Sequence, residues 1–120
     1  MITNTIQELF DRKSVRVFTD REILPEEKAL ILKAAAAAPT AGNQQLYTIL
    51  DITDQELKNK LAETCDHQPF IAKAKMVLIF CADYQKWYDA FQAVDCEPRK
   101  PGPGDLMLAC SDANIAAQNA

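Results

Sequence analysis

The sequence predicts an α+β fold in which a sheet lies between layers of helices. Residues 46–52 and 76–82 have the composition of β-strands, and the segments around them repeat apolar residues at helical spacing. The chain has 120 residues, 48% of them hydrophobic, which is enough for one domain with a core and too few for two. We therefore expect a single domain over residues 1–120.

The first part of the chain predicts two helices separated by an extended segment. Apolar residues at helical intervals indicate a short helix over residues 5–10. Residues 14–18 alternate polar and apolar side chains, which suits an extended segment whose successive residues face opposite ways. Pro25 at a first-turn position predicts a helix over residues 26–38 that stops before Pro39. We expect its buried stripe to comprise Leu30, Ile31, Ala34, Ala35 and Ala38.

The middle of the chain predicts a strand followed by a capped helix. Residues 46–52 are rich in β-branched and aromatic side chains, as in a strand. Thr53 and Glu56 then fit a capping box, in which each side chain would satisfy a free backbone N–H at the helix entrance. Leu57 and Leu61 supply the apolar side of that helix.

The second strand and the last helices follow. Residues 76–82 are almost continuously apolar, which predicts a central strand covered on both faces. Residues 84–94 predict an aromatic-rich helix, and the prolines and glycines of residues 97–104 predict a loop. We expect Asp105 to cap the last helix. Its predicted buried stripe comprises Leu106, Ala109, Cys110, Ala113 and Ala117.

The end of the sequence predicts a truncated domain. Residues 116–120 contain no glycine cap, basic residue or proline, so the chain stops inside its own helical pattern. A sheet of the two predicted strands alone would leave long unpaired edges. We expect further strands to come from additional sequence or from a partner.

Charge and composition exclude several classes of function. A formal charge of −4 and a pI near 4.9 argue against nucleic acid as a partner. No apolar stretch approaches the roughly 18 residues of a membrane span, and residues 1–10 contain no basic residue of a secretory signal. We therefore expect a cytoplasmic protein with no membrane partner. Cys65 and His67 are the only hint of a metal site, and we expect no metal there.

One short segment concentrates positive charge in this acidic chain. Arg12, Lys13 and Arg16 place three of the 13 basic residues within five positions. In an extended strand residues 12, 14 and 16 project to one side, so two guanidinium groups and the Ser14 hydroxyl can converge on a phosphate. The alternative is an ordinary exposed basic turn.

Three segments, in order along the chain, resemble one family. Residues 11–18 resemble the Arg-x-Ser-x-Arg-x-Phe signature of nitroreductases, and residues 38–45 resemble the Ala-Pro-Ser/Thr-x-x-Asn-x-Gln loop of the same family. Residues 65–71 resemble the NADPH-preferring, oxygen-insensitive branch and its related flavin reductases. Beyond these three segments, residues 105–120 also resemble the long central helix of that branch.

The resemblance implies a nitroreductase-like three-layer α-β-α sandwich that forms a homodimer with FMN at the interface. It assigns Arg12, Lys13, Ser14 and Arg16 to the FMN phosphate. It also implies flavin contacts from the side chains or backbone of Pro39, Thr40, Asn43 and Gln68. An ordinary helix-to-strand turn is the alternative for residues 39–45, and a loop amide that caps a neighbouring backbone group is the alternative for Gln68.

The implied activity is transfer of electrons from NAD(P)H, the co-substrate, through FMN to a nitroaromatic, quinone or flavin acceptor. No catalytic side chain is required, because the cofactor carries the redox chemistry and the protein orients it. Three alternatives stay open. They are a flavin-binding or dimerising module without turnover, a related reductive dehalogenase or flavin-fragmenting enzyme, and a generic α/β domain. The native acceptor and the choice between NADH and NADPH are not predicted.

Overall fold

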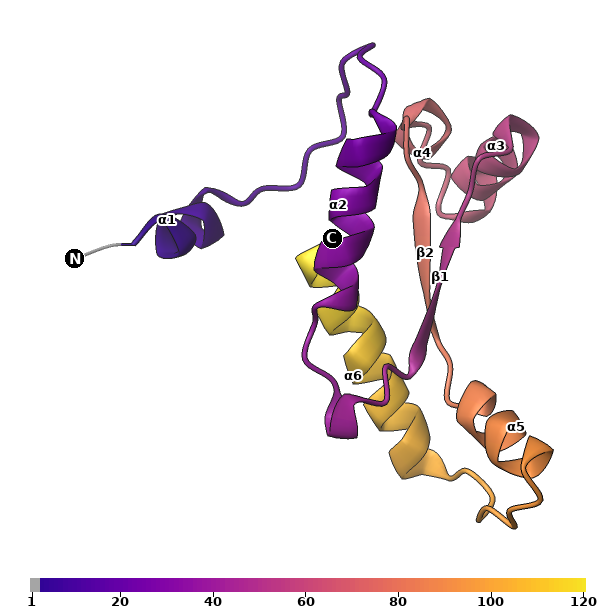
Figure 1. Cartoon of the computed structure of the whole chain (residues 1–120). Helices are drawn as coiled ribbons and strands as arrows, with labels where there is room; N and C mark the ends of the chain where they lie inside the picture. Colours follow the sequence, from indigo (N-terminus) through magenta and orange to yellow (C-terminus); the bar gives the residue numbers. More distant parts are fainter. Residues whose placement is uncertain (1–2) are drawn as a thin grey trace.

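The computed structural model describes residues 3–120 and combines helices with a two-stranded sheet (Figure 1). This mixed content confirms the α+β prediction. Met1 and Ile2, which begin the segment considered as a possible signal sequence, lie outside the described residues. In chain order the elements are α1 (Asn4–Asp11), α2 (Pro25–Ala36), the 3₁₀ helix η1 (Ala41–Asn43), β1 (Tyr47–Asp51), α3 (Gln55–Thr64), α4 (Phe70–Lys73), β2 (Leu78–Ala82), α5 (Gln85–Ala93) and α6 (Pro103–Asn119).

The sheet is an antiparallel pair whose strands are far apart in sequence. Tyr47 lies opposite Ala82 and Asp51 opposite Leu78. The amide of Ile52 donates to the carbonyl of Val77 at 2.9 Å, which continues the pairing beyond the strand ends. The helices α3 and α4 lie in the long connection between β1 and β2, at one end of the pair (Figure 1).

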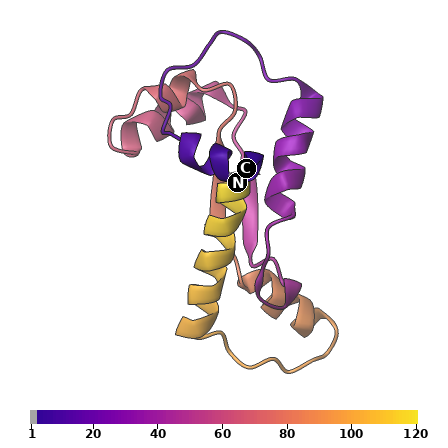
Figure 2. The ribbon, with the colours of Figure 1, turned by 90° about the vertical axis from the view of Figure 1, so that its left-hand side faces the viewer.

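The core lies where α6 meets the sheet and α2, and alanines surround Tyr47 in it. The helix α6 packs against both strands and against α2, and Figure 2 shows it running along the strands. Ala35, Ala109 and Ala116 are fully buried. Because alanine projects little from a helix, the backbones approach closely and no large side chain within residues 3–120 is fully buried.

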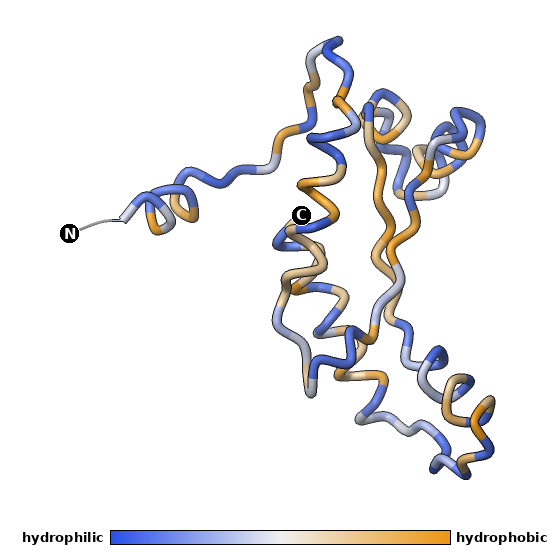
Figure 3. The backbone as a smooth tube through the Cα atoms, in the orientation of Figure 1, coloured by the Kyte–Doolittle hydropathy of each residue, from blue (hydrophilic) through white to orange (hydrophobic). Residues whose placement is uncertain are grey.

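The chain is less compact than a globular domain of the same length. Its radius of gyration is 17.3 Å, whereas about 14 Å is expected for a compact domain of this size. The helix α1 stands apart from the other helices in Figure 1 and has no buried residue. The hydropathy colouring in Figure 3 shows apolar residues on this arm as well as on the strands. Many apolar side chains within the described residues are therefore exposed. None of the helices in this part of the chain is long and apolar enough to cross a bilayer.

Two predicted helix starts were wrong in detail. The residue that caps α3 is Asp54, whose carboxylate accepts a hydrogen bond from the amide of Leu57 at 2.7 Å, and not Thr53. The helix α6 begins at Pro103, so Asp105 lies in its first turn and its carboxylate accepts from the amide of Gly102 at 2.7 Å. The cap of α3 shifts by one residue, because neighbouring polar residues offer the same hydrogen bond, and the cap of α6 shifts by three residues to Gly102.

The predicted buried stripes were only partly right. Leu30 on α2 is 66% exposed and Leu57 on α3 is 42% exposed, while Lys58 and Ala62 are the buried residues of α3. On α6 the predicted Leu106, Cys110 and Ala117 are exposed. The helix instead buries Ala109, Asp112, Ala113 and Ala116. A helical repeat indicates an apolar face, but the neighbours decide which part of it is covered.

The expected central strand is half-buried. Leu78, Ile79, Phe80 and Cys81 of β2 are of intermediate exposure, and Ala82 is exposed. Within the described residues β2 pairs only with β1. Complete cover on both faces, as predicted for residues 76–82, is not present in this chain alone.

Exchanging Asp54 for alanine should destabilise α3. The Asp54 carboxylate is the side chain that satisfies the free Leu57 amide, and loss of such an N-cap costs about 1 kcal/mol. Urea unfolding of Asp54→Ala should show this decrease in the free energy of unfolding. Thr53→Ala is the matched control and should change little, because the Thr53 hydroxyl makes no hydrogen bond to any residue that the structure describes. Equal losses in both variants would contradict the assignment of the cap.

Exchanging Asp105 for asparagine should remove a pH-dependent contribution to stability. Two hydrogen bonds from Arg99 and one from the Gly102 amide lower the pKa of Asp105 to about 2. An aspartate in the unfolded chain titrates near about 3.9. The stabilisation is therefore complete above about pH 4 and is lost as the pH falls through the folded pKa. The difference between wild type and Asp105→Asn, measured in urea at several pH values, should shrink over this acidic range. A constant difference would contradict the pKa shift.

Candidate functional site

The predicted phosphate-binding residues lie between α1 and α2. Arg12, Lys13, Ser14 and Arg16 are all exposed, in a segment without helix or strand. None of the ion pairs found within residues 3–120 includes Arg12, Lys13 or Arg16. The cations in those pairs are Arg21, Lys28, Lys75 and Arg99. The cluster therefore keeps its positive charge available to an external anion.

Aromatic contacts place Arg16 beside the segment that carries Gln68. The Arg16 guanidinium lies 5.7 Å from the centre of the Phe70 ring, and the Phe18 ring meets Phe70 edge-on at 6.3 Å. An adjoining hollow of about 390 Å³ is open to solvent. It is lined by Arg16, Val17, Phe18, Thr19, Asp20, Lys73 and Lys75. The sequence did not predict the two lysines, because they come from α4 and the chain after it.

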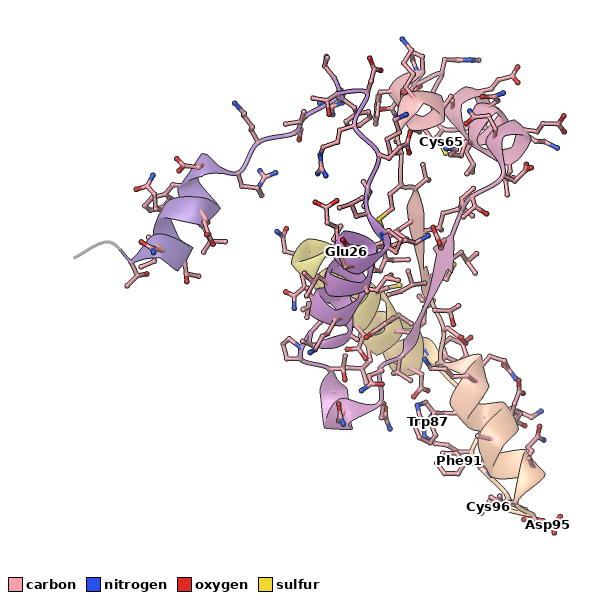
Figure 4. All side chains as sticks on the ribbon, turned by 45° about the horizontal axis from the view of Figure 1, so that its top comes forward. Glu26, Cys65, Trp87, Phe91, Asp95 and Cys96 are labelled. Carbon is pink, nitrogen blue, oxygen red and sulfur yellow. The ribbon has the colours of Figure 1, made fainter. Side chains whose placement is uncertain are left out.

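The Gln68 side chain makes a local contact. Its Nε2 donates to the carbonyl of Cys65 at 3.0 Å, and its backbone amide donates to Ala62 at 2.7 Å. Gln68 thus closes the end of α3, which is the structural alternative considered for it from the sequence. Cys65 and His67 are exposed (Figure 4 labels Cys65), and the described residues contain no group of three or more side chains that would hold a metal ion.

The second predicted segment forms a tight turn around η1. The Thr40 hydroxyl accepts from the amide of Gln45 at 3.2 Å, and the Asn43 side chain accepts from the Gln45 side chain at 3.1 Å. Gly42, Asn43 and Gln45 all have positive φ, at 59°, 55° and 52°. Glycine adopts this region without strain and asparagine tolerates it, so Gln45 is the residue that its surroundings must hold there.

Two residues outside the predicted set anchor this turn. Asp112 of α6 accepts hydrogen bonds from the amides of Ala41 at 3.4 Å and Leu46 at 3.1 Å. The indole N–H of Trp87 on α5 donates to the carbonyl of Gln44 at 2.7 Å. The sequence contained one signal that could have identified Asp112. An acidic residue there interrupts a set of alanines at helical spacing, on a helix face that has to be buried.

A small aromatic cleft lies beside the Trp87 anchor. Trp87 and Phe91 are neighbours on α5, with ring centres 5.8 Å apart (Figure 4). The cleft has a volume of about 150 Å³, and its lining includes Arg99 and Asp105, which form an ion pair. None of the predicted site residues lines it.

The predicted residues fall into two groups within one chain. Arg16 and the Gln68 segment meet at Phe70, whereas the turn with Pro39, Thr40 and Asn43 lies against the middle of α6, well away from residues 12–16 (Figures 1 and 2). The structure therefore joins the first and third segments and leaves the second apart.

Comparison with known proteins relates the whole arrangement to one group of enzymes. The chain is 35% identical over 120 residues to the FMN reductase (NADPH) of Bacillus subtilis, a match that covers 98% of this chain and 48% of that protein. Among solved structures, NfrA1 nitroreductase from B. subtilis superposes with a TM-score of 0.91 at 30% identity, over 97% of this chain and 48% of that one.

A third relative belongs to the same group. The NADPH:FMN oxidoreductase from Vibrio harveyi, solved in complex with NAD⁺, superposes with a TM-score of 0.88 at 29% identity, over 98% of this chain and 49% of that one. The chain thus spans about half the length of the relatives it matches. These likenesses confirm the nitroreductase-like fold predicted from the sequence. The nitroreductase family model matches residues 9–120, so this chain belongs to the nitroreductase family.

Proposed function

We propose that the protein carrying this chain is an FMN-dependent oxidoreductase that transfers electrons from NAD(P)H to nitroaromatic, quinone or flavin acceptors. The observation that carries the proposal is the family match over residues 9–120, together with relatives that are named as NADPH-dependent flavin reductases and nitroreductases. The chemistry supplied by a bound FMN would be uptake of a hydride and release of electrons to the acceptor, with the protein providing orientation.

The phosphate of FMN is assigned to Arg12, Lys13, Ser14 and Arg16. The fit rests on charge. These cations are exposed and have no carboxylate partner within residues 3–120, although the chain as a whole carries a net charge of −4. A phosphate bound by two guanidinium groups gains charge-assisted hydrogen bonds with defined geometry. Contact between Arg16 and Phe70 restricts the side chain before binding, which lowers the entropy cost of ordering it.

The flavin ring is assigned to Gln68 and to the turn with Pro39, Thr40 and Asn43. Since this turn and residues 12–16 lie apart within one chain, a shared flavin requires the turn of a second copy. We therefore propose a homodimer. Exposed apolar side chains support it, among them Phe10 on α1 and Met107 on α6, because a subunit interface would cover such surface.

Three further parts belong to the proposal. Residues 1–120 are part of one domain, and the relatives, of which this chain covers about half, contain the whole of it. A cytoplasmic location follows from the use of NAD(P)H. The partners are small electron acceptors rather than nucleic acid, since the chain is acidic.

Removing one guanidinium from the phosphate site should weaken FMN binding. A hydrogen bond to a charged group contributes about 1.5–3 kcal/mol, so Arg12→Gln and Arg16→Gln in the intact protein should each raise the Kd for FMN roughly tenfold or more. Quenching of FMN fluorescence measures the Kd. The matched control is Arg21→Gln, because the Arg21 guanidinium is already paired with Glu27. Unchanged affinity in both test variants would overturn the phosphate site.

The activity itself is tested with the same intact protein loaded with FMN. NADPH oxidation, followed by absorbance with nitrofurazone and with a quinone as acceptors, should give turnover that saturates with both substrates. Tight FMN binding without NADPH or NADH oxidation would indicate a flavin-binding module instead. Absence of any flavin absorbance bands after loading would reject the assignment to FMN altogether.

A further inference from the structure

Asp112 is a buried carboxylate that the proposed function does not use. It lies in the middle of α6 among alanines, and only 3% of its surface is exposed. Burying a carboxylate is strongly unfavourable unless hydrogen bonds replace its water. Asp112 has no ion-pair partner within the described part of the chain. Its compensation must therefore come from hydrogen-bond donors.

Both donors come from the turn that carries the proposed flavin contacts. One oxygen, Oδ1, accepts from the amide of Ala41 at 3.4 Å, and the other, Oδ2, accepts from the amide of Leu46 at 3.1 Å. These amides flank Gly42, Asn43 and Gln45, the residues with positive φ. One carboxylate thus holds the two ends of the turn at a set separation.

The turn needs such an anchor. Gln45 occupies a backbone region that costs most residues other than glycine on the order of 1–3 kcal/mol, and Asn43 occupies the same region, which asparagine tolerates better. Local hydrogen bonds from the Thr40 hydroxyl and the Asn43 side chain offset part of this cost, but both groups belong to the turn and move with it. Within the described chain, only Asp112 and Trp87 form side-chain hydrogen bonds that connect the turn to helices outside it.

We propose that Asp112 is a positioning residue for flavin binding. Acting through the amides of Ala41 and Leu46, it holds residues 40–45 in the conformation that presents Thr40 and Asn43 to the flavin. The inference rests on the proposed function, since it requires the turn to contact FMN. It also accounts for an aspartate in an alanine-lined helix face, where an apolar residue would otherwise pack better.

Asparagine at this position is a sharp test. Asp112→Asn keeps the size and shape of the side chain but has one acceptor oxygen, and its NH₂ group would face an amide N–H that also donates. The variant therefore loses one of the two bonds with little change in packing. The matched control is Asn119→Ala. This change removes another hydrogen bond from an α6 side chain to distant backbone, the 3.1 Å contact with the carbonyl of Ala34, which lies away from the turn.

Two measurements on the intact protein separate positioning from general stability. Hydrogen exchange without FMN should be roughly tenfold faster at Ala41 and Leu46 in Asp112→Asn, and the Kd for FMN should rise by a similar factor. Asn119→Ala should lower the free energy of unfolding without either effect. If Asp112→Asn does not fold, Ala41→Pro serves instead, because proline lacks the amide donor and suits the first position of a 3₁₀ turn after the extended Thr40. It should show faster exchange at the Leu46 amide and a smaller rise in the Kd for FMN.

The outcomes distinguish this inference from the proposed function. Unchanged exchange at Ala41 and Leu46 in Asp112→Asn would overturn the anchor. Faster exchange with an unchanged Kd for FMN, or equal losses of affinity in Asp112→Asn and Asn119→Ala, would overturn its role in positioning while the proposed function stands. A wild-type protein that binds no FMN would overturn both.

Discussion

The arrangement of this chain depends on a single buried carboxylate. Asp112 accepts hydrogen bonds from the amides of Ala41 and Leu46, which are 71 and 66 residues away in sequence. Leu46 in turn accepts from the amide of Asp83 at 2.9 Å, which follows β2. One interaction therefore connects the last helix, the turn before β1 and the end of the strand pair. In a core where no large side chain of residues 3–120 is completely buried, this directional contact supplies a specificity that apolar burial alone does not.

Small residues make that contact possible. Alanines at positions 35, 109, 113 and 116 let α6 approach α2 and the sheet closely, so that short polar side chains on α6 reach backbone groups of other elements. The same composition limits how much apolar area the chain buries by itself. Larger apolar side chains lie on the outside, on α1, on α5 and along the outer face of α6. The helix α6 thus joins α2 and the strands, while many large apolar side chains remain exposed.

The proposed site follows this division. Its cationic part lies on an extended segment that Phe70 holds through ring contacts, and its turn lies at the other end of α2 against α6. The exposed segment carries charge, which acts over a distance, and the anchored turn carries strained backbone, which requires a rigid support. Under the proposed function both parts hold one cofactor, since flavin mononucleotide has its phosphate at one end and its ring system at the other.

The sequence alone determined the family and the types and approximate ranges of the described elements, except the short helices α4 and η1. Residues 46–52 and 84–94 were predicted within a few positions, because composition and spacing act locally. Arg12, Ser14 and Arg16 could be recognised as part of the family's signature motif, because that motif is continuous in sequence.

The tertiary structure alone decided which faces are buried and which polar groups meet. The apolar repeat of α6 was compatible with several phases, and only contact with α2 and the strands selected the face that contains Asp112. Its hydrogen bonds to Ala41 and Leu46 join residues far apart in sequence. No local pattern encodes such a pairing, because its energy depends on distances that exist only after the chain has folded.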